Sequence, residues 1–134
     1  MNPLNFFQLA NDLVHFSPSY PDEILFRTAI NRLYYGMFHL IQQELGISIP
    51  KEQRKRIHKY VKEKIEGYPF IGDYMKLEEF RVDADYFIAS KKANIQDFNE
   101  ALKLKDRISI SLQGTGNIGF ESDDDFFFRT KTPK

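Results

Sequence analysis

The residues of this chain best suited to chemistry lie on one apolar segment, residues 27–45, with the sequence RTAINRLYYGMFHLIQQEL. In an α-helix Arg32, Tyr35 and His39 fall along one line, with Arg32 and His39 two turns apart. A histidine can move a proton and an arginine can stabilise a phosphorane, which together suit metal-free cleavage of RNA. The competing interpretation is a buried polar cluster, in which Arg32 bonds a carboxylate such as Asp85 and His39 bonds a backbone carbonyl.

A second group of candidate residues lies on the basic segment 51–66. Seven cations stand there against three acids, and this surplus has two interpretations. One is a solvated helix face, and the other is a phosphate-contacting surface for RNA or a nucleotide. The run Asp123–Asp125 is opposite in sign and able to mask this surface. The ligand candidates on the basic segment are Arg54, Lys55, His58 and Lys59.

Further along the chain, Arg81 and Asp85 are four residues apart, which lets them pair on one face of a helix, with Tyr86 adjacent. A structural ion pair with a packed tyrosine is one interpretation of this group. The other is a ligand site that also includes Tyr35.

Metal and thiol chemistry are not expected. The chain has no cysteine, so disulfides are excluded. Its three histidines, His15, His39 and His58, form no i, i+3 or i, i+4 pair together with a carboxylate. We therefore predict no metal site and no cofactor.

The segments that position these residues are all predicted to be helices, because their apolar residues recur with a period of about 3.6 residues. Pro21 and the two acids after it predict the start of the second helix, and Gly46 predicts its end. Asn94 is predicted to be the N-cap of the last helix. Gly36 is expected at a close approach between two helices. The second helix, apolar on most sides, should be central and packed by the first, fourth and fifth. The predicted helices span residues 4–15, 22–45, 51–66, 73–90 and 95–112.

These elements predict an all-α fold, an up-and-down bundle of four to five helices. The bundle occupies residues 1–113, and residues 114–134 form a polar and aromatic C-terminal tail. Because a bundle of this size buries little and its central helix is apolar on several sides, we expect a homodimer.

The bulk composition limits the location of the chain and the partners it attracts. The chain has 19 lysine and arginine residues and 19 aspartate and glutamate residues, so its formal net charge is zero. No overall positive charge therefore attracts it to nucleic acid or to a membrane. No apolar stretch approaches the ~20 residues of a membrane-spanning helix, and the N-terminus does not read as a signal peptide. We expect a cytoplasmic protein with no membrane association.

The motifs together resemble those of HEPN-domain proteins, especially the small stand-alone branch. Residues 32–39 resemble that family's R-x-Y-Y-A-x-F-H segment, with Gly36 where alanine is common. His58 and Val61 resemble its H-x-x-V, and residues 81–86 (RVDADY) its R-x-x-A-D-Y. Residues 97–112 match the closing helix of the family loosely, and the resemblance extends over residues 4–112.

This resemblance implies a helical bundle that usually forms a homodimer. It implies a module that binds RNA, a nucleotide or a minimal nucleotidyltransferase antitoxin, in a toxin–antitoxin or defence-type system. One alternative is an active metal-independent endoribonuclease toxin, because Arg32 and His39 fit the family's signature of an arginine followed, after four to six residues, by a histidine. A second alternative is a purely structural adaptor.

Overall fold

The computed structural model describes residues 2–16, 22–86 and 93–115, and every regular element in these ranges is a helix. The predicted all-α class is therefore confirmed. The α-helices are α1 (Leu4–Phe16), α2 (Asp22–Leu45), α3 (Ile57–Lys64), α4 (Ile71–Tyr86) and α5 (Ile95–Thr115), and a 3₁₀ helix, η1 (Lys51–Arg56), precedes α3.

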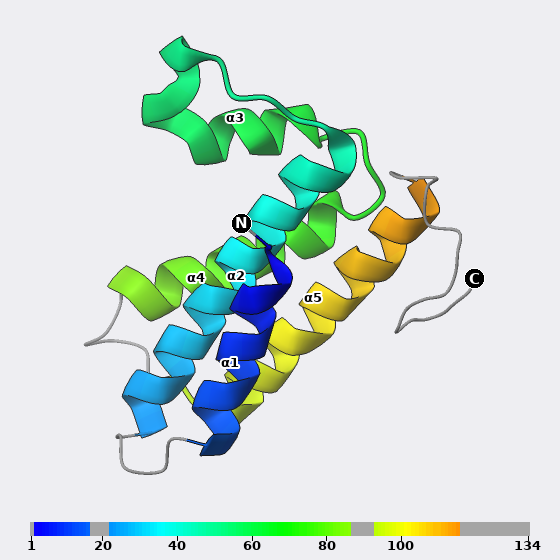
Figure 1. Cartoon of the computed structure of the whole chain (residues 1–134). Coiled ribbons are helices and arrows are strands. Elements are labelled where there is room, and N and C mark those ends of the chain that lie inside the picture. The colour runs from blue at the N-terminus through cyan, green and yellow to red at the C-terminus, as the bar shows by residue number, and fades with distance from the viewer. Residues whose placement is uncertain (1, 17–21, 87–92, 116–134) are drawn as a thin grey trace.

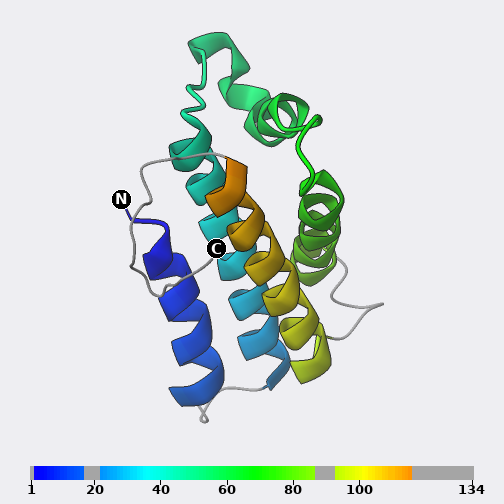
Figure 2. The same ribbon diagram turned by 90° about the vertical axis from the view of Figure 1, so that its right-hand side faces the viewer.

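Four of the helices form an up-and-down bundle. Successive helices α1, α2, α4 and α5 alternate in direction, and η1 with α3 lies at the end where α2 and α5 finish (Figures 1 and 2). α2 packs against α1, α4 and α5, and α4 packs against α5. The predicted central position of the second helix is confirmed.

The predicted ends of α2 match the structure. It begins at Asp22 and ends at Leu45, and Gly46 follows in the left-handed conformation with a φ of 64°. The N–H of Ile47 donates to the carbonyl of Gln42 at 2.9 Å. The N–H of Gly46 donates to the next carbonyl along the helix at 3.4 Å. This pair of bonds is the Schellman arrangement, which satisfies carbonyls that the helix end leaves free.

The start of α5 also follows its sequence signal. The N–H of Asp97 donates to Asn94 Oδ1 at 2.9 Å, and the N–H of Asn94 donates to Asp97 Oδ2 at 3.1 Å. These reciprocal bonds form a capping box, so the predicted role of Asn94 is confirmed.

The third predicted helix differs most from the structure. Its first half, Lys51–Arg56, is a 3₁₀ helix, and only Ile57–Lys64 is α-helical. No residue of η1 is buried, and no side chain caps its first turn. With no apolar anchor on the bundle, this half lacks the packing that stabilises most protein helices.

The other boundaries agree more closely. α4 begins at Ile71 and is described to Tyr86, so the rest of the predicted helix to residue 90 lies outside the described residues. α5 continues to Thr115 rather than ending at residue 112. Most of the predicted tail, from residue 116, lies outside the described residues.

The core follows α2 along most of its length. Ala29, Ile30, Leu33, Met37 and Ile41 are almost fully buried there. On α1, Ala10 is fully buried, whereas Leu9 is 44% exposed. None of the helices in the described ranges combines the length and apolar character needed to cross a bilayer.

Candidate functional site

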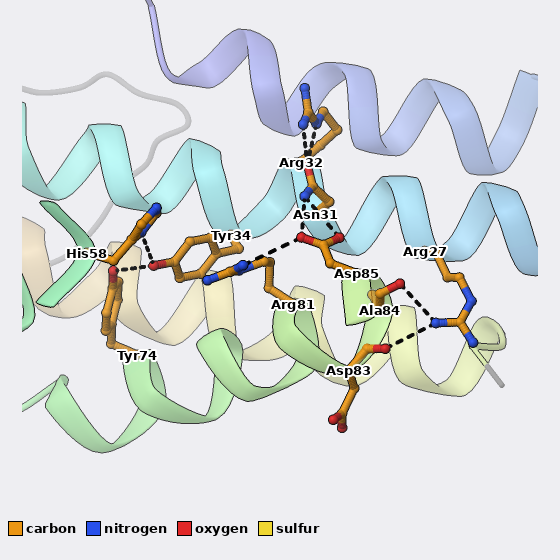
Figure 3. Close-up of polar contacts among 10 residues, drawn as sticks. All are labelled: Arg27, Asn31, Arg32, Tyr34, His58, Tyr74, Arg81, Asp83, Ala84 and Asp85. Carbon is orange, nitrogen blue, oxygen red and sulfur yellow. Dashed lines mark hydrogen bonds and ion pairs between the residues drawn. The ribbon is translucent and has the colours of Figure 1, made fainter. Parts of the chain in front are cut away.

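Polar side chains of α2, α3 and α4 meet inside the bundle and form one connected group, the α2–α4 polar cluster. Figure 3 shows that most of them point toward one another from neighbouring helices. Connected polar groups of this kind are stable in a low dielectric only when their hydrogen bonds are satisfied. The members are Asn31, Tyr34, Tyr35, His58, Tyr74, Arg81 and Asp85.

Arg81 is the charged centre of this cluster. Its side chain is only 9% exposed, and its Nη1 lies 3.6 Å from Asp85 Oδ2, so the predicted i, i+4 pair is present. The guanidinium carbon lies 4.9 Å from the ring centre of Tyr34, 5.8 Å from that of Tyr35 and 5.9 Å from that of Tyr86. Arg81 is therefore stabilised by one carboxylate and three aromatic faces.

Asn31 connects the two arginines of the site. Its Nδ2 donates to both oxygens of Asp85, at 3.2 and 3.0 Å. Arg32 in turn donates to Asn31 Oδ1 from Nε, at 3.0 Å, and from Nη2. The expected direct bond from Arg32 to Asp85 was wrong, because the asparagine amide stands between the guanidinium and the carboxylate, as Figure 3 shows.

Tyr34 holds α2 to both α3 and α4 through its hydroxyl. This oxygen lies 2.8 Å from His58 Nδ1 and 3.0 Å from the hydroxyl of Tyr74. Burial raises the pKa of Tyr34 to about 12 and also raises the pKa of Tyr74 strongly. Burial, reinforced by the charge of Arg81, lowers the pKa of His58. Near neutral pH these three side chains are therefore uncharged and act as hydrogen-bonding groups.

His39 lies apart from this cluster. Its ring stacks on Phe6 of α1, with centroids 5.5 Å apart and planes at 23°, and burial lowers its pKa. The guanidinium carbon of Arg32 also lies 5.5 Å from the centre of the Phe6 ring. Within the described residues no hydrogen bond joins Arg32 to His39. The two predicted catalytic side chains thus share an aromatic neighbour, while Arg32 is bonded to Asn31.

The predicted ligand residues fall into two groups. Tyr35, His58, Arg81, Asp85 and Tyr86 are brought together, since the rings of Tyr35 and His58 are 5.5 Å apart and Arg81 contacts both tyrosines. The remaining three lie on η1 and α3 and are exposed to solvent. They are Arg54, Lys55 and Lys59.

Three members of the cluster, Asn31, Tyr34 and Tyr74, were not among the candidate site residues named from the sequence. Their signal was a polar stripe at helical spacing on otherwise apolar helices. Asn31 lies one turn before Tyr35, and Tyr74 lies two turns before Arg81. Polar side chains repeating at i, i+4 and i, i+7 on buried helices indicate a shared internal network.

The described residues contain no group of three or more histidine, cysteine, aspartate or glutamate side chains placed to hold a metal ion. Comparisons with protein-family models, with curated proteins and with solved structures found no match to this chain. The arguments below therefore rest on the sequence and on the geometry described above.

The lowered pKa of His58 predicts a loss of stability in mild acid. The unfolded chain binds a proton at about pH 6.5, and the folded chain binds it only at lower pH, so unfolding becomes easier as pH falls through that window. Thermal melts of the parent between neutral and mildly acidic pH should show this decline, to which His39 also contributes. His58→Gln should make the decline shallower, and a slope equal to that of the parent would contradict the assignment.

Proposed function

We propose that this chain is a HEPN-like helical module that binds RNA through phosphate contacts of η1 and α3, as part of a toxin–antitoxin or defence-type system. The single observation that carries this proposal is a set of exposed cations on one projecting edge of the bundle. This set, the basic edge, consists of Lys51, Arg54, Lys55, Lys59 and Lys64.

The basic edge differs from the two other cations of the same segment, which form ion pairs. Arg56 pairs with Glu63 at 3.0 Å, and Lys62 pairs with Glu78 of α4 at 2.9 Å. Across the described ranges, no ion pair involves any cation of the basic edge. An uncompensated group of cations supplies the electrostatic contact that phosphate groups need, although the whole chain is neutral.

The α2–α4 polar cluster supports this function by fixing α3, which carries Lys59 and Lys64 of the basic edge, on the bundle. α3 is joined to α2 by the contact of His58 with Tyr34, and to α4 by the bond from Lys62 to Glu78. Val61 and Ile65 add fully buried apolar contacts. The exposed cations of α3 are therefore held in a fixed register, which lowers the entropy lost on binding.

Two partners belong to the same proposal. A minimal nucleotidyltransferase antitoxin is the partner that the HEPN resemblance implies. A second copy of the chain is the other, and its contact would cover apolar side chains of the surface. Leu9 and Phe16, two turns apart on α1, are 44% and 74% exposed, and Ile24 at the start of α2 is 56% exposed. Light scattering at micromolar concentration separates a dimer from a monomer.

The nuclease alternative makes a separate prediction at His39. Because His39 stacks on Phe6 and is partly buried, His39→Ala should lower the free energy of unfolding by roughly 1–2 kcal/mol. The parent should leave a labelled RNA at full length in the presence of a chelator. If the parent shortens the RNA, and His39→Ala and Arg32→Ala both stop this without changing the melt, the chain is a nuclease that uses these two residues.

The proposed binding surface can be mapped by NMR on the full chain. A single-stranded RNA of about 20 nucleotides is titrated into the ¹⁵N-labelled protein at low salt. Amide shifts should be concentrated in residues 51–64. Shifts confined to the α1 surface, or no shifts at a large excess of RNA, would reject the proposed function.

A further inference from the structure

A groove opens beside the basic edge, between the end of α2 and α3. Its volume is about 320 Å³, within the range of ligand-binding pockets. The groove is lined on the α2 side by Leu45, Gly46, Ile47 and Ser48, and on the α3 side by Tyr60, Lys64 and Tyr68. The ammonium group of Lys64 lies 5.3 Å from the ring centre of Tyr60. This α2–α3 groove therefore combines apolar and aromatic walls with a cation at its rim.

The charge next to this groove is strongly positive. Lys59 is exposed one residue before Tyr60, and Lys55 one turn earlier on η1. Neither forms an ion pair within the described ranges. A complementary occupant would carry large apolar side chains for the groove and several acidic groups for its rim.

The chain itself contains a segment of this composition. Residues 121–128 read ESDDDFFF, with Asp123–Asp125 directly before Phe126–Phe128. Elsewhere the sequence has no run of three acids followed by three aromatic residues. Three adjacent phenylalanines next to three aspartates match both the walls of the groove and the sign of its rim.

The geometry of the bundle brings this segment within reach. α5 ends at Thr115, at the same end of the bundle as the end of α2 and as α3 (Figures 1 and 2). The connection from Thr115 to Asp123 can span at most about 25–30 Å when extended. A tether of this length keeps the segment close to the groove at high local concentration.

We propose that residues 123–128 of this chain dock on its own α2–α3 groove, with Phe126–Phe128 against the aromatic walls and Asp123–Asp125 on the basic edge. A segment with a dissociation constant of about 100 µM is docked in about nine of ten molecules at an effective concentration of about 1 mM. Docking covers the basic edge and so competes with RNA. This consequence rests on the proposed function, whereas the docking itself does not.

The docking is tested on the full chain with one nitroxide label. Because the chain has no cysteine, Ser122→Cys gives a single attachment site. The nitroxide should broaden the amide signals of residues 45–48 and 59–68 in the ¹⁵N-labelled protein. Replacing Phe126–Phe128 by serine in the same labelled chain should restore those signals. Broadening centred elsewhere, or broadening that survives this replacement, would overturn the docking.

A mixing experiment distinguishes docking within one chain from docking between chains. Spin-labelled chains without ¹⁵N are mixed with ¹⁵N-labelled chains without the nitroxide. Signals of the groove should stay sharp if each segment docks on its own chain. If these signals broaden in the mixture, the segment occupies the groove of a second copy, and the proposal fails.

The competition with RNA gives an independent readout. With about one molecule in ten undocked, replacing Phe126–Phe128 by serine should raise the apparent RNA affinity about tenfold. An unchanged affinity of a chain that does bind RNA would contradict the masking role. If the parent and the serine variant both fail to bind RNA, the proposed function fails, and the nitroxide experiment still decides the docking.

Discussion

Gly36→Ala should lower the free energy of unfolding by about 2 kcal/mol, a fall in Tm of roughly 5–10 °C. A Cβ at this position would lie 2.6 Å from Phe7 Cε1 and 2.8 Å from Phe6 Cβ. The Cβ of Phe6 is fixed to the backbone of α1, so relief requires that helix to shift. The higher helix propensity of alanine offsets only about 1 kcal/mol of this cost. The close helix approach expected at Gly36 is thereby confirmed.

Gly72→Ala is the matched control for this prediction. Gly72 is also helical, in the first turn of α4, and a Cβ there meets nothing within 4 Å. Its substitution should leave the melt unchanged or raise Tm, since only the propensity gain remains. Equal effects of the two substitutions would show that the contact of α1 with α2 is looser than described.

Asp85→Ala should destabilise the bundle by about 2–4 kcal/mol. The substitution leaves the guanidinium of Arg81, 9% exposed, without its carboxylate, and it also removes the acceptor of Asn31. The partial exposure of Asp85 itself, 27%, keeps the expected loss below that of a fully buried pair. Urea unfolding of the variant and the parent measures the difference.

A double substitution distinguishes the loss of the Arg81–Asp85 ion pair from the cost of leaving the Arg81 guanidinium buried and unpaired. Arg81→Met with Asp85→Leu removes both charges and should recover more than half of the loss, because no unpaired guanidinium remains. Asp73→Ala, which breaks the exposed pair with Arg107, should have a much smaller effect than Asp85→Ala. If the double variant is less stable than Asp85→Ala alone, the cation is not what makes the single change costly.

The fold was predictable where local signals and burial agree. The capping box of Asn94 and the glycine stop at Gly46 each act within one turn, so the sequence alone indicates them. The 3₁₀ form of Lys51–Arg56 was not predictable in this way. It depends on the absence of a tertiary anchor for that half of the segment, which no local pattern records.

The candidate site was predictable only in part, for a similar reason. The pair Arg81–Asp85 follows from spacing along one helix. The insertion of Asn31 between Arg32 and Asp85 depends on how α2 faces α4, and the hydrogen bond between Tyr34 and His58 depends on where α3 crosses. Contacts between elements decide these partners. The predictions that the chain binds RNA, forms a dimer or pairs with a nucleotidyltransferase remain predictions.

The RNA affinities of two charge-matched variants test the central claim most directly. Lys55→Gln with Lys59→Gln removes two cations of the basic edge, and Lys76→Gln with Lys103→Gln removes two exposed cations of α4 and α5. Fluorescence anisotropy with a single-stranded RNA at about 100 mM salt should show about 20-fold weaker binding for the first variant and nearly parental binding for the second. Equal affinities of the two variants would contradict an RNA surface on η1 and α3.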